Sequence, residues 1–153
     1  MLRLVYDSDN MDCDLAVTED GTDVSRSLET AVLISLFSDA RAEPADDLLE
    51  GTERRGWWAE AYFDGDEHGD VWGSKLWQLE TRKATAESLV FAQTAAERSL
   101  EWLIEDGICQ AVSVETWWLE GRQGYMGLLV TLKRPDKVSP EYIGPWELHY
   151  AVV

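Results

Sequence analysis

The first part of the chain combines short apolar stretches with turn-forming residues. Residues 2–5 read LRLV, in which apolar side chains alternate with a charge, and this pattern is typical of a short edge strand. Residues 6–14 are rich in turn formers. Residues 15–23 read LAVTEDGTD, which predicts another short strand and a turn at Asp20 and Gly21. We therefore expect two short strands before the first helix.

Residues 27–39, SLETAVLISLFSD, carry the first helical pattern. Ser25 or Ser27 can cap this helix, and Glu29 then lies in the first turn, where the helix dipole favours an anion. The interior sequence AVLISLF is apolar on nearly every side. Because a helix that is apolar all round is buried all round, we expect it to be the central helix of the domain.

A second helix is predicted over residues 85–107. Thr85 is a suitable N-terminal cap, and Gly107 is a suitable C-terminal stop. Apolar and small residues recur along it at spacings of three and four, and the small ones allow close approach to the first helix. These residues are Leu89, Ala92, Ala96, Ser99 and Leu103.

Three strands are predicted near the end of the chain, over residues 108–118, 125–134 and 146–153. Alternation places Ile108, Val112, Val114 and Trp118 on one face of the first, and Trp146, Leu148, Tyr150 and Val152 on one face of the last. Helices separate from an antiparallel sheet make an α+β domain. The sequence predicts two main helices packed on a small antiparallel sheet.

Residues 40–80, which join the two helices, show no clear hydrophobic period and contain a proline and several glycines. A segment this long without regular structure is uncommon in a compact domain and is usually functional. It holds four of the eight tryptophans of the chain, which are Trp57, Trp58, Trp72 and Trp77. We therefore expect a long aromatic loop between the helices.

The size and composition of the chain suit one folded domain over residues 1–153, since 45% of the residues are hydrophobic. Nothing in the sequence approaches the length of a membrane span, and residues 1–10 lack the features of a signal peptide, so we expect intracellular synthesis. Cys13 and Cys109 are then expected to be reduced thiols. Without a CxxC motif, a thiolate metal cage is excluded.

The formal net charge of −17 is distributed unevenly. Residues 1–70 hold 19 acidic and 5 basic side chains, and residues 71–153 hold 11 acidic and 8 basic ones. A field of this sign repels nucleic acid and anionic membranes, so we expect neither as a partner. The acidic half favours a basic protein partner; the alternative is that it is simply a solvated surface.

Candidate chemistry in the sequence is sparse. Residues 64–70, DGDEHGD, place Gly69 as an EF-hand loop does, but His68 takes the fifth position and Lys75 the twelfth, so a solvated acidic turn is favoured over a calcium site. With 30 acidic residues, close carboxylate pairs do not single out a glycosidase. His149 reads as an edge or surface residue. We predict no catalytic residue, no metal and no cofactor.

Eight tryptophans are more than a core of this size requires. Core packing is favoured for Trp77 and Trp102. Exposed aromatic residues beside arginines, as in RRGWW at residues 54–58, are typical of protein interfaces, and a sugar-binding platform is the weaker alternative. The predicted partner interface comprises Arg54, Arg55, Trp57, Trp58, Trp72, Trp146 and Tyr150.

Four stretches, LETAVLISLFSDARAEPADD, ERRGWWAEAY, GSKLWQLETRKATAESL and AERSLEWLIEDGICQAVSVE, occur in order along the chain. Together they resemble the family of small baseplate wedge proteins of Mu-like phages, which is related to the small wedge subunit of T-even phages. The resemblance runs from about residue 2 to the C-terminal strand. Its most distinctive parts are residues Leu28–Val32 of the first predicted helix, RRGWW at residues 54–58 and GSKLW at residues 73–77.

The resemblance implies a structural part of a contractile tail, present in several copies around the tail axis. Such a protein joins larger wedge proteins to the spike, tube and sheath, and it is found in the virion baseplate and, during assembly, in the host cytoplasm. Some relatives are labelled lysozyme-like. Relatives often carry a Glu-Pro-Arg triplet after the second helix; here the place reads IEDGICQAV, so the triplet is absent.

Three functions follow from these patterns. The favoured one is a non-enzymatic wedge subunit whose terminal strands pair with neighbouring chains. A lysozyme-like glycosidase is the first alternative, which cell-wall hydrolysis would reveal. An acidic mimic of DNA is the second, and it predicts acids spread along an elongated face. The clustering of the acids in turns and the tryptophan content argue against it.

Overall fold

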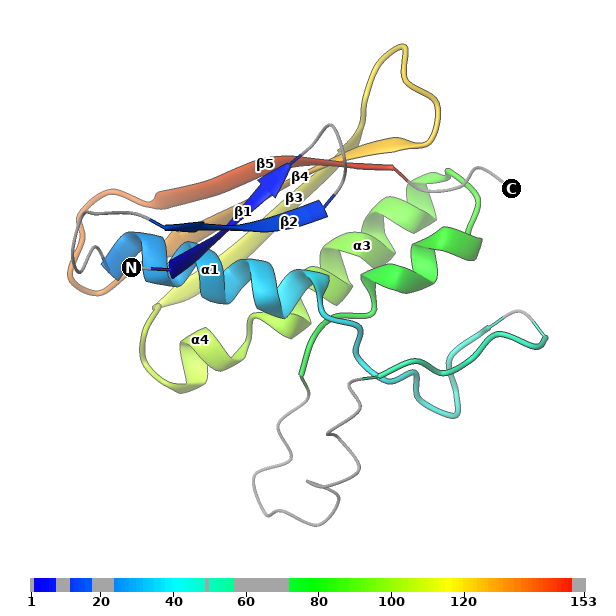
Figure 1. Ribbon diagram of the computed structural model, residues 1–153, viewed down its shortest axis with the longest axis horizontal. Helices are drawn as coiled ribbons and strands as arrows, with labels where there is room; N and C mark the ends of the chain where they lie inside the picture. The colour runs from blue at the N-terminus through cyan, green and yellow to red at the C-terminus, as the bar shows by residue number, and fades with distance from the viewer. Residues whose placement is uncertain (1, 8–11, 18–23, 49, 57–71, 150–153) are drawn as a thin grey trace.

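The computed structural model describes residues 2–7, 12–17, 24–48, 50–56 and 72–149, with side chains from Leu28 onward. The chain forms an α+β fold, as predicted, and its elements follow one another as shown in Figure 1. They are β1 (Leu2–Asp7), β2 (Asp12–Val17), α1 (Val24–Phe37), the 3-10 helix η1 (Leu76–Thr81), α3 (Ala86–Ser99), α4 (Trp102–Glu105), β3 (Ala111–Trp118), β4 (Tyr125–Lys133) and β5 (Glu141–His149).

The strands form two separate antiparallel sheets. β1 and β2 make a hairpin, and β3, β4 and β5 make a three-stranded sheet in that order. Alternate residues of the central strand β4 are fully buried because successive side chains of a strand point to opposite faces. These residues are Met126, Leu128, Val130 and Leu132, and they form the floor of the core.

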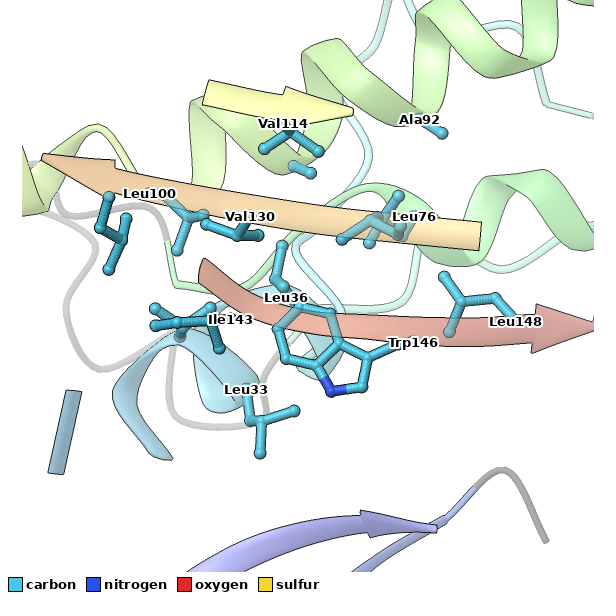
Figure 2. Close-up of a cluster of buried hydrophobic side chains, with 14 of the residues drawn as sticks. Leu33, Leu36, Leu76, Ala92, Leu100, Val114, Val130, Ile143, Trp146 and Leu148 are labelled. Carbon is cyan, nitrogen blue, oxygen red and sulfur yellow. The ribbon is translucent and has the colours of Figure 1, made fainter. Parts of the chain in front are cut away.

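Helix α1 closes one side of this core (Figure 2). Leu33 and Leu36 are 1% exposed and lie by Ile143 and Trp146 of β5. Phe37 adds an edge-to-face contact with Trp146, with ring centroids 5.8 Å apart, which is the preferred geometry for two aromatic rings. The end of α1 is thereby fixed against the sheet.

The expectation that this helix is buried all round was wrong, because Ile34 is 40% exposed. The helix contacts the sheet on one side and β1 of the hairpin on another, so part of its circumference stays open. It also begins at Val24 and not at residue 27. Ser25 therefore lies inside the helix, and Glu29 lies beyond its first turn.

The predicted second helix is broken in two. Thr85 caps α3 as expected, accepting a hydrogen bond from the backbone N–H of Ser88. After Ser99 the chain turns at Leu100, and the four-residue α4 follows. Leu100, at the break, and Leu103, in α4, both have no exposed surface, so the core continues across the break. Gly107, at a positive φ of 70°, ends this part of the chain.

The predicted burial of the α3 face that carries small residues is confirmed, since Ala92 and Ala96 are fully buried. This face lies mainly against β3, and its contact with α1 is smaller than expected. In β3, Val114 is 2% exposed and Trp118 packs against the core, as the alternation predicted. Ile108 was wrongly assigned to that face: it precedes the strand and is 37% exposed.

The last strand begins earlier than predicted, at Glu141, and residues 150–153 lie outside the described part. Leu148 is buried, as the alternation predicted.

Cys109 is a buried free thiol. Burial raises the pKa of this thiol, which keeps it protonated and unreactive at neutral pH. Within the described residues, no helix is long and apolar enough to cross a membrane.

The one-sided burial of α1 can be tested with two neighbouring residues. Leu33→Ala should lower the free energy of unfolding by about 2–5 kcal/mol, because it leaves a cavity in the core. Ile34→Ala should cost less than about 1 kcal/mol, since that side chain is part-exposed. Urea denaturation of the purified variants measures both. Equal losses would contradict the assignment of the two faces.

Candidate functional site

The two ends of the long segment between α1 and α3 are joined by backbone hydrogen bonds. The N–H of Ser74 donates to the carbonyl of Ser38 at 2.8 Å, and the N–H of Ala40 donates to the carbonyl of Ser74 at 2.9 Å. The Ser74 hydroxyl also donates to the carbonyl of Leu36, in the last turn of α1. The segment therefore leaves and returns at one point, the C-terminal end of α1.

Gly73 makes this junction possible. Its φ is +85°, a conformation that side chains with a Cβ rarely adopt. A Cβ at this position would also lie 2.3 Å from the carbonyl oxygen of Ser38, which is backbone and cannot move aside easily. The glycine in the GSKLW stretch is therefore required by two independent constraints.

Trp77 anchors the returning end of the segment. It is 6% exposed, and its indole N–H donates to the carbonyl of Ala40 at 2.8 Å. The core role predicted for this residue is confirmed. It lies in η1, a 3-10 helix that the sequence pattern did not predict, together with the buried Leu76 and Leu79.

Arg55 links the outgoing and returning parts. Its guanidinium lies 4.8 Å from the centre of the Trp77 ring and pairs with Asp39 at 3.2 Å and with Glu80 at 2.5 Å. The backbone N–H of Ala42 donates to the carbonyl of Arg54, which closes residues 42–54 at their base. The cyan and teal chain around this closure projects away from the sheet in Figure 1.

A group of polar side chains centred on Asp46 secures the same region. Lys75 Nζ lies 2.7 Å from Asp46 and 3.1 Å from Glu43. Gln78 Nε2 and the backbone N–H of Glu43 also donate to the Asp46 carboxylate. Burial alone raises the pKa of Asp46, but these hydrogen bonds outweigh it, so the pKa lies below its usual value of 3.8.

The structure brings together only part of the predicted interface. Arg54 is exposed, Arg55 is held by its ion pairs, and Trp72 is 54% exposed. The assignment of Trp146 to the interface was wrong. This side chain is 5% exposed and lies in the core, because strand alternation turns it inward against Phe37. The other predicted interface residues, Trp57, Trp58 and Tyr150, lie outside the described part, as does the acidic loop 64–70.

Sequence reasoning missed the residues that hold this region in place, namely Asp46, Lys75 and Gln78. The GSKLW stretch was the available signal, since it contains both Gly73 and Trp77. Among the described residues, His, Cys, Asp and Glu side chains form no group of three that could hold a metal. The described residues of this region are held in place by ion pairs and by the buried indole of Trp77.

Comparison with known proteins decides the family. Residues 28–139 match the family described as Phage protein GP46, which is more than half of the chain. The chain belongs to this family. The match begins at Leu28 in α1 and ends before β5, so it is narrower than the resemblance expected from the sequence. It includes the whole segment between α1 and α3, which is called the anchored segment below.

Two similar proteins support the same placement. The chain is 41% identical over 123 residues to the Baseplate protein gp46 of Escherichia phage Mu, a match that spans 78% of this chain and 80% of that protein. It is 37% identical over 105 residues to the Mu-like prophage FluMu protein gp46 of Haemophilus influenzae, spanning 69% of this chain and 68% of the relative. The predicted kinship with Mu-like phage proteins is confirmed.

The lowered pKa of Asp46 predicts a pH-dependent contribution to stability. Because the pKa is lower in the folded state, the ionised carboxylate stabilises the fold above pH 3.8, and this contribution is lost as the pH falls through the folded-state value. Asp46→Asn should therefore lower the free energy of unfolding at neutral pH. The difference from the wild-type protein should shrink as the pH falls below about 4.

Urea denaturation at several pH values measures this difference. The matched control is Asp47→Asn, which changes an exposed neighbour that forms no ion pair with any described residue. It should have little effect at any pH. A constant difference between wild type and Asp46→Asn across the pH range would contradict the role assigned to the carboxylate.

Proposed function

We propose that this chain is a non-enzymatic structural subunit of the baseplate wedge of a contractile phage tail. It links larger wedge proteins to the central spike and tube and to the sheath, in several copies around the tail axis. The observation that carries the proposal is the 41% identity to the Baseplate protein gp46 of Escherichia phage Mu, which covers 80% of that protein.

The anchored segment supports an assembly role. Its two ends are fixed by the Ser38–Ser74 junction and by Trp77, so the residues between them start from a rigid base. Fixed ends lower the entropy lost when a partner binds the described residues of the segment. Arg54, Arg55, Trp57, Trp58 and Trp72 belong to this segment, and we assign them to the contact with another wedge protein.

The edges of the three-stranded sheet support strand pairing at one side. The edge of β3 is covered by α3: Glu97 accepts a hydrogen bond from the N–H of Val114, and the Thr116 hydroxyl donates to the carbonyl of Leu89. β5 has β4 as its only strand partner within the described chain. We therefore assign strand addition by a neighbouring chain to β5.

Pro145 limits how a strand can be added to β5. It lacks a backbone N–H and lies with Gly144 at the point where the register with β4 shifts, between Leu128 and Val130. An added strand can therefore form an uninterrupted ladder only before or after this point. The four residues from Trp146 to His149 form one such stretch.

The interface assignment predicts the behaviour of Trp57→Ala/Trp58→Ala. This variant should fold but fail to enter tails, because it removes two aromatic anchors from a contact surface. The measurement is the abundance of the protein in tails purified from a Mu-like phage whose own copy is replaced. Trp117→Ala is the control, since it removes a part-exposed indole from the sheet and should enter tails.

Three results would contradict these assignments. Normal entry of the double variant would exclude the tryptophan pair as an anchor, and global unfolding would place the pair in the core. Hydrolysis of peptidoglycan by the purified protein, abolished by one carboxylate substitution, would contradict the non-enzymatic assignment and favour the lysozyme-like alternative.

Strand addition at β5 predicts a local change in hydrogen exchange. Backbone amides in peptides covering Glu141–His149 should exchange more slowly in assembled tails than in the isolated chain, because a new ladder protects them. Peptides from β3 serve as the control, since α3 already covers that edge. Unchanged exchange over β5, with the chain present in the tails, would exclude this edge as a pairing site.

A further inference from the structure

A pocket of about 390 Å³ lies where the base of the anchored segment meets α3. Residues 40–44 form one wall and Gly73–Lys75 another, and the last turns of α3 contribute Ala95, Arg98 and Ser99. Its volume falls in the range of ligand pockets, which is about 300–1,000 Å³. It can therefore hold a few side chains of another molecule.

The charge of this pocket is opposite to that of the protein. Its lining contains the cations Arg41, Arg54, Lys75 and Arg98 and the single carboxylate Glu43. The chain as a whole carries a net charge of −17. Four basic side chains from four separated positions in the sequence are thus gathered at one point of an acidic molecule.

The positive charge is only partly neutralised within the chain. Lys75 is held by Glu43 and Asp46, and Arg98 lies 3.5 Å from Glu43. Arg41 and Arg54 are exposed and form no ion pair with any residue that the structure describes. Among the described residues these two guanidinium groups are therefore not neutralised, and guanidinium is the group best suited to bind a carboxylate through two hydrogen bonds.

The rest of the pocket lining is mainly apolar and suits small apolar side chains of a ligand. Ala40 and Ala42 are 2% and 3% exposed, and Pro44 and Ala95 add further carbon surface. The hydroxyls of Ser74 and Ser99 donate to backbone carbonyls of the chain itself. Hydrogen bonds to a ligand would therefore come mainly from the arginines.

We propose that this pocket binds an acidic peptide segment of another protein of the baseplate. This inference rests on the proposed function and names the chemistry of one partner. Nucleic acid is disfavoured, because the overall negative charge repels a phosphate polymer. A second copy of the chain is disfavoured because it brings a net charge of −17 with it, whereas one short acidic segment brings only its own few carboxylates to the pocket.

The test places a photo-crosslinking amino acid at Pro44, an exposed residue of the pocket, in a tail-producing strain. The crosslinked peptide is then sequenced from purified tails. We expect a segment of another tail protein that carries at least two Asp or Glu residues. The same amino acid at Pro140, an exposed proline between β4 and β5, is the position control and should not capture that segment.

Charge reversal provides the second arm. Arg41→Glu/Arg54→Glu should lower the yield of this crosslink by about tenfold or more, because like charges then face each other across the contact. Lys83→Glu/Lys133→Glu changes the net charge equally at two exposed lysines outside the pocket and should leave the yield unchanged. Circular dichroism verifies that both variants are folded.

The outcomes separate this inference from the proposed function. If the chain is present in tails but the Pro44 position captures only a second copy, a segment without acids, or nothing, the pocket inference is wrong and the baseplate role stands. An equal loss of crosslink in both charge variants would also overturn it. If the chain is absent from tails, the proposed function fails and the inference fails with it.

Discussion

The backbone junction between Ser38 and Ser74 is the constraint on which the functional half of this molecule depends. Closing a long segment costs conformational entropy, and the cost grows only slowly with segment length. The junction offsets this cost with two backbone hydrogen bonds, and the burial of Leu76, Trp77 and Leu79 adds apolar contacts at the same point. Only glycine fits at position 73, because a Cβ there would collide with the carbonyl of Ser38. This one residue therefore helps determine where the segment begins and ends.

The fold class and most elements were predictable, whereas the anchoring of the long segment was not. Periodicity reports which face of a helix or strand is apolar, so it identified β3, β4 and the start of α3 within a few residues. It does not report where a helix breaks, as at Leu100, because the apolar spacing continues across the break to Leu103. Nor does it detect contacts such as those of Arg55 with Glu80 and Asp46 with Lys75, which join residues far apart in sequence.

The tryptophans show the same limit. An indole-rich composition indicated an interface, but it could not separate Trp146, whose side chain is turned into the core by strand alternation, from Trp72, which is more than half exposed. Charge was misleading in a similar way. The net charge described the long-range field, which favours basic partners, whereas the cationic pocket is a local feature that arises only when Arg41, Arg54 and Arg98 are brought together by the fold.

The two charge patterns are compatible because they act over different distances. At physiological ionic strength, electrostatic interactions between exposed groups are screened beyond about 8 Å. The field of the overall negative charge is therefore weak until two molecules are close, and at contact a positive pocket can dominate the interaction with a carboxylate. In Figure 1, β5 runs along one long side of the molecule, and the anchored residues 40–56 project from the other. The two surfaces therefore do not compete for the same space, which is what the proposed contacts with two neighbours require.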